Sequence, residues 1–195
     1  GNIQPWAVVE AFNKAQLQWV RRQLEGINQS KAGAEGTTRR IDDLEFILTP
    51  SPLTMTDRGI YWDSPKPDDY MEWCRVSTSA YDRCCPPRPM VIYLGTETNR
   101  DIDLADDGRQ PSFQWATTFA TQLSNNIRIY TNGEFGLQDT ILTYYRFPRN
   151  IQIAGTPDIY QSGSPIAPVD IESEAPEDVQ EIMVEDAARI IAGDI

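Results

Sequence analysis

The last third of the chain places a tight-turn signal between two strand-like segments, and this combination limits the possible folds most. Ile127–Tyr130 and Thr140–Phe147 are rich in β-branched and aromatic residues, and Asn132-Gly133 lies between them. A type I′ turn requires positive φ at both central residues, a conformation that Asn and Gly adopt at low cost. The pattern predicts a β-hairpin, and Gly136, between the turn and Thr140, predicts a bulge in its second strand.

An amphipathic helix is predicted at each end of the chain. Residues 5–27 carry apolar side chains at helical spacing, and Pro5 suits the first turn. The segment that starts near Pro176 repeats this pattern, with Gly193 as its predicted C-terminal cap. The fold class predicted from these signals is α+β: an N-terminal amphipathic helix, a central antiparallel β-rich domain with the Asn-Gly hairpin, and a C-terminal helix.

The middle of the chain predicts short strands that are separated by proline-rich breaks. Prolines at positions 50 and 52, and at 86, 87 and 89, are expected to end regular structure, and polar residues 96–108 predict a long exposed loop. The expected strands are Arg58–Trp62, Cys74–Thr78 and Met90–Leu94, and Arg146–Ile153 is expected to continue the last strand. We divide the chain into an N-terminal helix and linker (1–40), a central β-rich domain (41–155), and a connector with the C-terminal helix (156–195).

Charge is unevenly distributed along the 195 residues. The formal net charge is −12, from 29 acidic and 17 basic residues. Phosphate binding needs clustered Lys and Arg, so this balance argues against a nucleic-acid-binding surface over the whole molecule. Residues 170–186 hold eight carboxylates and no basic residue: Asp170, Glu172, Glu174, Glu177, Asp178, Glu181, Glu185 and Asp186.

The chain contains no histidine, which removes the commonest general base and the commonest metal ligand. It also has no phosphate-binding loop, no dinucleotide-binding glycine pattern and no nucleophile elbow. With 29 acidic residues some carboxylate pair always lies close together, so a pair alone is no sign of hydrolysis. We therefore predict that the chain is not an enzyme and has no catalytic, cofactor-binding or metal-binding residues.

Two groups of residues match metal sites only in part. Asp101–Gly108 spaces its carboxylates as a calcium loop does, but the fifth, sixth and twelfth positions of the EF-hand pattern hold Ala, Asp and Ser. Cys74, Cys84 and Cys85 are an odd number of cysteines without histidine, which is a poor set of zinc ligands. We expect a solvated acidic loop and reduced thiols; a zinc site completed by Asp or Glu is the alternative.

Two residue types suggest contact surfaces. Trp62 and Trp115 invite a sugar-binding interpretation, although aromatic residues at strand spacing are more often part of a core. Arginines in an acidic protein often pair with carboxylates at subunit contacts. The candidate arginines are spread through the chain: Arg39, Arg40, Arg75, Arg83, Arg88, Arg146 and Arg149.

Three blocks, and one loop that also fits, resemble a known family when they are taken in order. They are Lys14–Val20 in the leading helix, Ile127–Phe135 running into Tyr144–Pro148, Glu174–Asp178 opening the final helix, and the loop Asp101–Asp107 followed by Pro111–Phe113. This order resembles the head-to-tail connector proteins of tailed bacteriophages, the ring or neck-adaptor proteins, particularly those of crAss-like podoviruses. The resemblance covers most of the chain and rests on the order in which the motifs appear.

The resemblance implies a non-enzymatic virion protein without cofactors, located in the neck or tail and assembled in the cytoplasm of the host bacterium. Copies would form a homo-oligomeric ring, roughly twelve-fold to match the portal protein that it binds. The ring would join the portal to adjacent neck and tail proteins and line the channel, through which DNA passes transiently and without specific binding. An acidic lumen would repel the phosphate backbone. No membrane contact is expected, because no apolar run approaches the length of a span.

Two alternatives from other functional classes remain open. One is a receptor- or glycan-binding β-module of a phage tail, which would use an exposed Trp62 or Trp115. The other is a hydrolase that uses paired carboxylates, which the lack of histidine and of a nucleophile arrangement disfavours.

Overall fold

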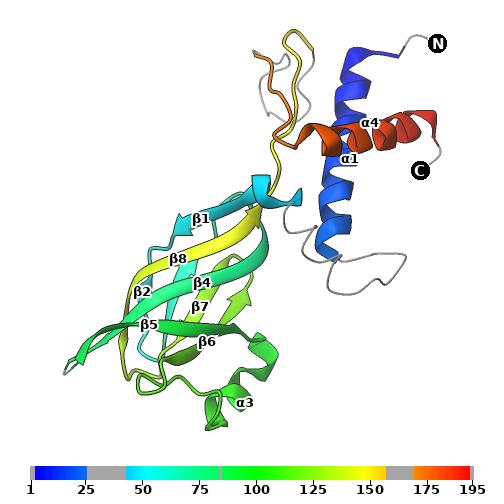
Figure 1. Ribbon diagram of the computed structural model, residues 1–195. Coiled ribbons are helices and arrows are strands. Elements are labelled where there is room, and N and C mark those ends of the chain that lie inside the picture. Colours follow the sequence, from blue (N-terminus) through cyan, green and yellow to red (C-terminus); the bar gives the residue numbers. More distant parts are fainter. Residues whose placement is uncertain (1–2, 26–42, 84, 157–168, 194–195) are drawn as a thin grey trace. The chain divides into compact units, whose positions relative to one another are not determined.

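The computed structural model describes residues 3–25, 43–83, 85–156 and 169–193 (Figure 1). The α+β class, with a helix towards each end of the chain and a β-rich domain between them, is confirmed. The chain divides into two compact units, which we call unit 1 (residues 1–47 and 147–195) and unit 2 (residues 48–146). The first and last parts of the chain, which the sequence-based division treats as separate, thus belong to one unit. The predicted linker over 28–40 lies outside the described residues.

Unit 1 is built around two helices, α1 (Pro5–Glu25) and α4 (Glu177–Ala192), which contact each other. Each helix buries one apolar face, as the helical spacing predicts. The buried side chains include Val9, Phe12, Trp19 and Val20 on α1 and Val179, Met183 and Ala187 on α4. A short 3-10 helix, η1 (Glu45–Ile47), ends in the buried Ile47. The predicted C-terminal cap is confirmed, because Gly193 has a φ of +80° and its N–H donates to the Ile190 carbonyl at 3.2 Å.

Side-chain amides fix the chain after the sheet against α1. Asn13 both donates to and accepts from the main chain of Ile151, at 3.2 and 2.8 Å, and Gln16 donates to the Arg149 carbonyl at 3.0 Å. Both amide side chains are buried, and these bonds replace the water that Asn13 and the Gln16 amide nitrogen lose, whereas Gln16 Oε1 has no partner among the described residues. The expected strand over Arg146–Ile153 is wrong, because the last strand ends at Arg146 and only Gln152 forms a bridge, to Ile171.

Unit 2 is a mixed sheet of eight strands in the order β1-β8-β4-β5-β6-β7-β3-β2. Neighbouring strands are antiparallel except β5 and β6, which are parallel, so the prediction of a purely antiparallel domain is corrected in this detail. The strands are β1 (Leu48–Pro52), β2 (Thr56–Asp57), β3 (Tyr61–Pro65), β4 (Tyr70–Asp82), β5 (Cys85–Leu94), β6 (Thr117–Leu123), β7 (Asn126–Tyr130) and β8 (Gly136–Arg146).

The sheet is rolled, because its two end strands follow one another along the chain. Only residues 53–55 separate β1 from β2, and such a connection spans at most about 14 Å. In a flat sheet, seven strand spacings would hold the end strands about 34 Å apart. The rolled sheet encloses an apolar cluster from five strands and one loop: Val76, Ala80, Met90, Ala120, Ile127, Ile129, Phe135, Leu137, Leu142 and Tyr144.

The Asn-Gly turn forms, but the predicted hairpin does not. Asn132 and Gly133 have φ values of +53° and +75°, and the Glu134 N–H donates to the Thr131 carbonyl at 3.0 Å. However, β7 pairs with β6 and β3, whereas β8 pairs with β1 and β4. The Thr131 and Asn132 N–H groups donate to the Ile60 carbonyl at 3.0 and 2.9 Å, which ties the turn to the loop before β3. The turn therefore carries the chain from one part of the rolled sheet to another.

The predicted bulge at Gly136 is also absent, and this glycine has a different role. Gly136 pairs directly with Tyr81 across the strands. A Cβ atom at this position would lie only 2.3 Å from the Tyr81 ring, so a larger residue would require this exposed ring to move away from the strand. Shifts of register lie elsewhere in the β4–β8 pair, including one between Ser77 and Ser79.

The prolines lie within strands rather than between them. Pro50 and Pro52 belong to β1, an end strand, and Pro86, Pro87 and Pro89 lie in the part of β5 that pairs only with β4. Proline cannot donate to a second neighbour, but it is compatible with a strand that has one neighbour. Prolines at these positions therefore mark strand edges.

The predicted loop over 96–108 contains two short helices, η2 (Glu97–Asn99) and α3 (Arg100–Ala105). Figure 1 shows α3 at the end of β5. The polar composition of this segment does not reflect full exposure, because Asp103 is buried and Glu97 is half-buried. Ion pairs with arginines of the same unit, described below, hold these carboxylates in place.

Candidate interaction surfaces

The acidic segment of unit 1 separates into paired and exposed carboxylates. The buried Asp186 forms an ion pair with Arg22 of α1 and lies 3.3 Å from Nη1 of Arg189. Glu174 lies 3.4 Å from Nε of Arg149. These two pairs hold α4 and the segment before it within the unit.

The other six carboxylates of the segment are exposed: Asp170, Glu172, Glu177, Asp178, Glu181 and Glu185. Among the described residues, only Glu185 has a cation within 4.0 Å, the Nη2 of Arg189. Glu177 and Asp178 occupy the first turn of α4, where the helix dipole stabilises negative charge without a basic partner. We call these six residues the acidic face; the sequence locates the charge, and the structure shows which carboxylates are exposed.

In unit 2, Glu97 is the centre of a polar network over β6 and β7. Its Oε2 accepts hydrogen bonds from Thr121 Oγ1 at 2.6 Å and from the Tyr130 hydroxyl at 3.2 Å. Its Oε1 lies 3.1 Å from Nη1 of Arg128 and 3.4 Å from Nη1 of Arg100. Burial, followed by the charge of Glu97, raises the pKa of the Tyr130 hydroxyl. The network fixes η2 to the sheet, and sequence reasoning missed it because its members are distant in sequence.

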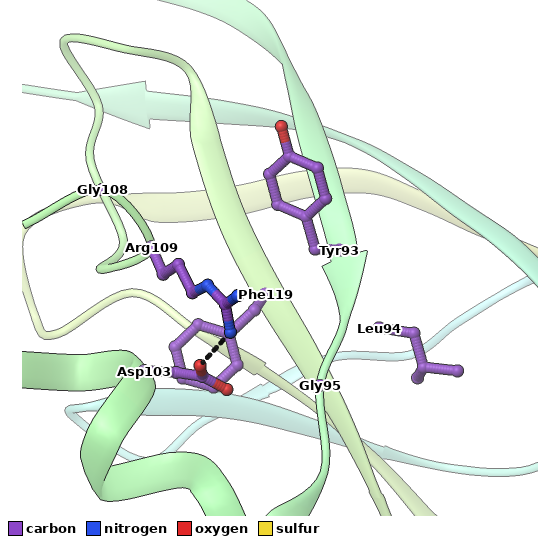
Figure 2. A pocket seen from close by; sticks show the side chains of 7 residues that line it. All are labelled: Tyr93, Leu94, Gly95, Asp103, Gly108, Arg109 and Phe119. Carbon is purple, nitrogen blue, oxygen red and sulfur yellow. Dashed lines mark hydrogen bonds and ion pairs between the residues drawn. The ribbon is translucent and has the colours of Figure 1, made fainter. Parts of the chain in front are cut away.

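A hollow of about 410 Å³ lies between β5 and the segment after α3, and Phe119 of β6 also lines it (Figure 2). Arg109 Nη1 lies 3.2 Å from Oδ1 of the buried Asp103, with the Phe119 ring next to the pair. A Cβ atom on Gly95 would lie 3.2 Å from Asp103 Oδ2, so the glycine allows this close approach. Because the guanidinium neutralises the carboxylate, the pair holds the segment after α3 rather than supplying a free base.

The candidate metal-binding residues do not come together. Asp101 pairs with Arg100 at 2.8 Å, Asp103 with Arg109, and Asp106 Oδ1 accepts the Gly108 N–H at 2.8 Å. In the part of the chain that the structure describes, no group of three or more Cys, Asp or Glu side chains is arranged to hold a metal ion.

Cys74 is an exposed free thiol on β4, and Cys85 is exposed at the start of β5. Cys84 lies outside the described residues.

The candidate arginines for subunit contacts are distributed over both units. Arg75, Arg83 and Arg88 are exposed on β4 and β5 or between them, and Arg146 ends β8. Arg88 lies over the Phe113 ring, 5.6 Å from its centroid. Arg149 pairs with Glu174 in unit 1, as described above, and Arg39 and Arg40 lie outside the described residues.

The two candidate tryptophans for sugar binding lie in different environments. Trp62 is half-buried and packs against the core of unit 2. Trp115 is 74% exposed in the turn before β6. Trp62 also lines a hollow of about 470 Å³, so the two rings differ in degree, and Trp115 is the more exposed of them.

Comparison of the sequence with known protein families finds no matching family, and comparison with curated proteins finds no relative. No helix in the described ranges is both long and apolar enough to cross a membrane. The surfaces of the two units therefore provide the functional information.

Proposed function

We propose that this chain is a non-enzymatic structural protein of a tailed bacteriophage, and that its copies form a ring in the neck or tail. The ring joins the portal to the tail and surrounds the DNA channel. The observation that carries the proposal is the acidic face of unit 1, six exposed carboxylates with one described basic group in reach, Arg189. Such a surface repels the phosphate backbone, so DNA can slide past it without being held.

Unit 2 offers a different kind of surface, which suits contact between protein subunits. Exposed apolar side chains gather on β5 and on the turn before β6, among them Val91, Tyr93, Leu94 and Trp115. Aromatic residues are enriched at protein interfaces, and charged residues are depleted at their centres. Copies related by rotation would join through two different surfaces of the chain, and a rotation that closes gives a ring.

The test is quantitative mass spectrometry of gradient-purified particles of the phage that encodes this chain. Copies are counted against the major capsid protein, with the portal protein as an internal reference of known ring size. A low fixed count near that of the portal is expected for a neck or tail ring. Absence of the chain from particles contradicts the proposal.

A second candidate is a glycan-binding module of a phage tail, which the exposure of Trp115 favours. An exposed aromatic ring can stack on a sugar face. Glycan-array binding that is lost in Trp115→Ala and kept in Trp62→Phe supports this candidate. Equal array signals for wild type and Trp115→Ala exclude a site at Trp115.

A further inference from the structure

The hollow that Trp62 lines lies at one end of the rolled sheet of unit 2. Its walls come from β2, the loop before β3, the β4–β5 turn, the β7–β8 turn and the first residue of β8. The antiparallel pairing of β2 with β3, β3 with β7, and β4 with β8 brings these connections to the same end of the sheet. The hollow measures about 470 Å³, a volume typical of small-ligand sites, which are common at the mouths of β-barrels.

Two aromatic rings from different strands line this hollow. Trp62 is half-buried on β3, and Tyr81 is 42% exposed near the end of β4, where its ring lies over Gly136. Among the described residues, neither ring contacts another aromatic ring or lies under a cationic group. The face of an aromatic ring attracts a cation, so both rings can still take one.

Three carboxylates line the same hollow, those of Asp57, Asp82 and Glu134. Asp57 is the direct partner of Trp62 in the β2–β3 pair, and residues directly opposite each other in a pair have side chains on the same face. Asp57 and Glu134 are both exposed, and in the described parts of the chain no cation lies within 4.0 Å of either. Two of the three carboxylates therefore lack a compensating charge.

The basic residues near the hollow do not balance its charge. Arg83, exposed on the β4–β5 turn, is the basic residue of the lining, so three carboxylates and one guanidinium leave an excess of two negative charges. Arg58 follows Asp57 in sequence, but its Nε lies 3.0 Å from Oδ1 of Asp63, and Arg58 is not part of the lining. The hollow is therefore both aromatic and anionic.

This combination favours one class of ligand. An organic cation gains from the aromatic faces and from the carboxylates together, whereas an anion is repelled. A neutral sugar could use the rings but would gain nothing from the excess charge. A bare metal ion is disfavoured, because the described residues hold no group of three or more ligating side chains arranged for a metal.

We propose that the hollow at Trp62 and Tyr81 binds an organic cation, an ammonium or guanidinium group that carries an apolar part. The rings would contact the cation and its apolar part, and the carboxylates of Asp57 and Glu134 would balance its charge. A free small amine and the Lys or Arg side chain of a protein share this chemistry. The site lies within unit 2 and does not depend on ring formation.

The first test compares choline with its uncharged isostere, in which carbon replaces the quaternary nitrogen. Heteronuclear NMR of the full chain follows the indole N–H of Trp62, assigned by its loss in Trp62→Phe. Choline should shift this signal in a saturable manner, and the isostere should bind about fivefold or more weakly. Equal binding of the two probes, or a response to a methyl glycoside without one to choline, overturns the inference.

The charges of the hollow are tested by a matched pair of double variants. Asp57→Asn with Glu134→Gln should weaken choline binding about tenfold, because it removes both uncompensated charges. Asp68→Asn with Asp107→Asn removes the same charge from exposed positions of unit 2 that do not line the hollow, and should change binding little. Arg83→Gln should tighten binding about twofold or more, since it removes a repelling cation. Equal affinities in the two double variants contradict the proposed role of the carboxylates.

The aromatic contribution is tested at Tyr81, because its exposed side chain can be changed without opening the core. Tyr81→Leu keeps an apolar side chain but removes the ring, and should weaken choline binding about threefold or more. Tyr81→Phe keeps the ring and should bind choline nearly as well as the wild type does. Equal weakening by both variants would assign the effect to the hydroxyl group and contradict the cation–ring contact.

A final comparison separates the two sources of the cation. Methylguanidinium and a capped Gly-Arg-Gly peptide carry the same charged group, but only the peptide offers a main chain. Tighter binding of the peptide assigns the site to a protein side chain, and equal or weaker binding assigns it to a free small cation. No response to choline, methylguanidinium or the peptide overturns the inference and leaves the proposed ring unaffected.

Discussion

The two units of this chain use charge in different ways. Unit 2 contains 13 acidic and 9 basic residues, and unit 1 contains 16 acidic and 8 basic residues. In unit 2, key carboxylates are paired and hold segments to the sheet, as Glu97 does with Arg128 and Asp103 does with Arg109. In the acidic segment of unit 1, two carboxylates have this role and six remain exposed. Unit 2 also has exposed carboxylates, among them Asp57, Glu72 and Glu134, but they are spread along its sequence, whereas the six of unit 1 lie together within residues 170–186.

The units also differ in how they satisfy their main-chain groups. The helices of unit 1 bond internally, and Gly193 caps the end of α4. In the rolled sheet of unit 2, no strand among the described residues pairs with the β4 side of Val91–Leu94. In the proposed function, the acidic face of unit 1 is the surface that repels DNA.

The largest expected effect tests whether the two units are separate in stability. Leu142 is fully buried in the core of unit 2, and Met183 is fully buried in unit 1. Each substitution to alanine should lower the free energy of unfolding of its own unit by about 2–5 kcal/mol, because it leaves a cavity. Hydrogen exchange followed by mass spectrometry should show faster exchange in β4 and β8 for Leu142→Ala, and in α1 and α4 for Met183→Ala. Equal acceleration in both units by either variant contradicts separate units.

The next effect concerns internal charge pairing in unit 2. Glu97→Gln removes the negative charge that faces the Arg128 and Arg100 guanidinium groups. We expect a loss of about 1–3 kcal/mol in the free energy of unfolding, because polar groups at the sheet lose their charged partner. Urea unfolding monitored by tryptophan fluorescence measures this loss.

The control is Asp101→Asn, whose side chain is 81% exposed although it also contacts Arg100. A surface change of this kind should stay within about 0.5 kcal/mol. Equal losses for the two variants would show that the Glu97 network does not hold η2 to the sheet.

Alkaline pH should affect unit 2 through two stacked tyrosines. Burial, with the charge of Glu72, raises the pKa of Tyr70 to about 12, and burial, with the hydrogen bond to Asp69, raises the pKa of Tyr144 to about 12. An unfolded tyrosine has a pKa near 10, so folding favours the neutral phenols. The stability that these groups contribute is complete below about pH 10 and is lost as pH rises towards 12.

Melting curves recorded from pH 8 to pH 12, with phenolate absorbance followed in parallel, measure this loss. We expect a stable plateau that falls only above about pH 10. Full tyrosine ionisation near pH 10 in the folded protein contradicts the buried environment of this pair.

The smallest expected effect on stability comes from the acidic face. The variant Glu177→Gln, Asp178→Asn, Glu181→Gln removes three exposed carboxylates from the first turns of α4. The lost interaction with the helix dipole should cost about 0.3–1 kcal/mol for each charge in the first turn. Thermal melting should therefore change little, whereas DNA passage should be slowed in particles that carry the variant. Unchanged ejection kinetics would separate the acidic face from the channel.

Several features of the fold could be predicted from sequence because they depend on local patterns. The helical spacing of apolar residues located α1 and α4, and Gly193 identified the end of α4 because its left-handed conformation suits glycine. The positive φ values at Asn132 and Gly133 follow from residue type in the same way. Strand pairing does not follow from residue type, because the partners of β7 and β8 are set by the rolled sheet as a whole.

The prolines show why other expectations were wrong. A position that bonds to a strand on each side excludes proline, and a single sequence does not reveal how many neighbouring strands a strand has. Pro87 is therefore compatible with β5, just as Pro50 is with β1. The open edge at Val91–Leu94 was hidden for a related reason. Its existence depends on where β4 and β5 separate, which depends on contacts far away in the sequence.

The most direct test of the different roles of the two units is a cryo-electron-microscopy map of the particle neck, resolved well enough to trace this chain. We expect a ring in which Glu177, Asp178 and Glu181 of α4 face the DNA channel. A map with α4 on the outer wall would contradict this assignment.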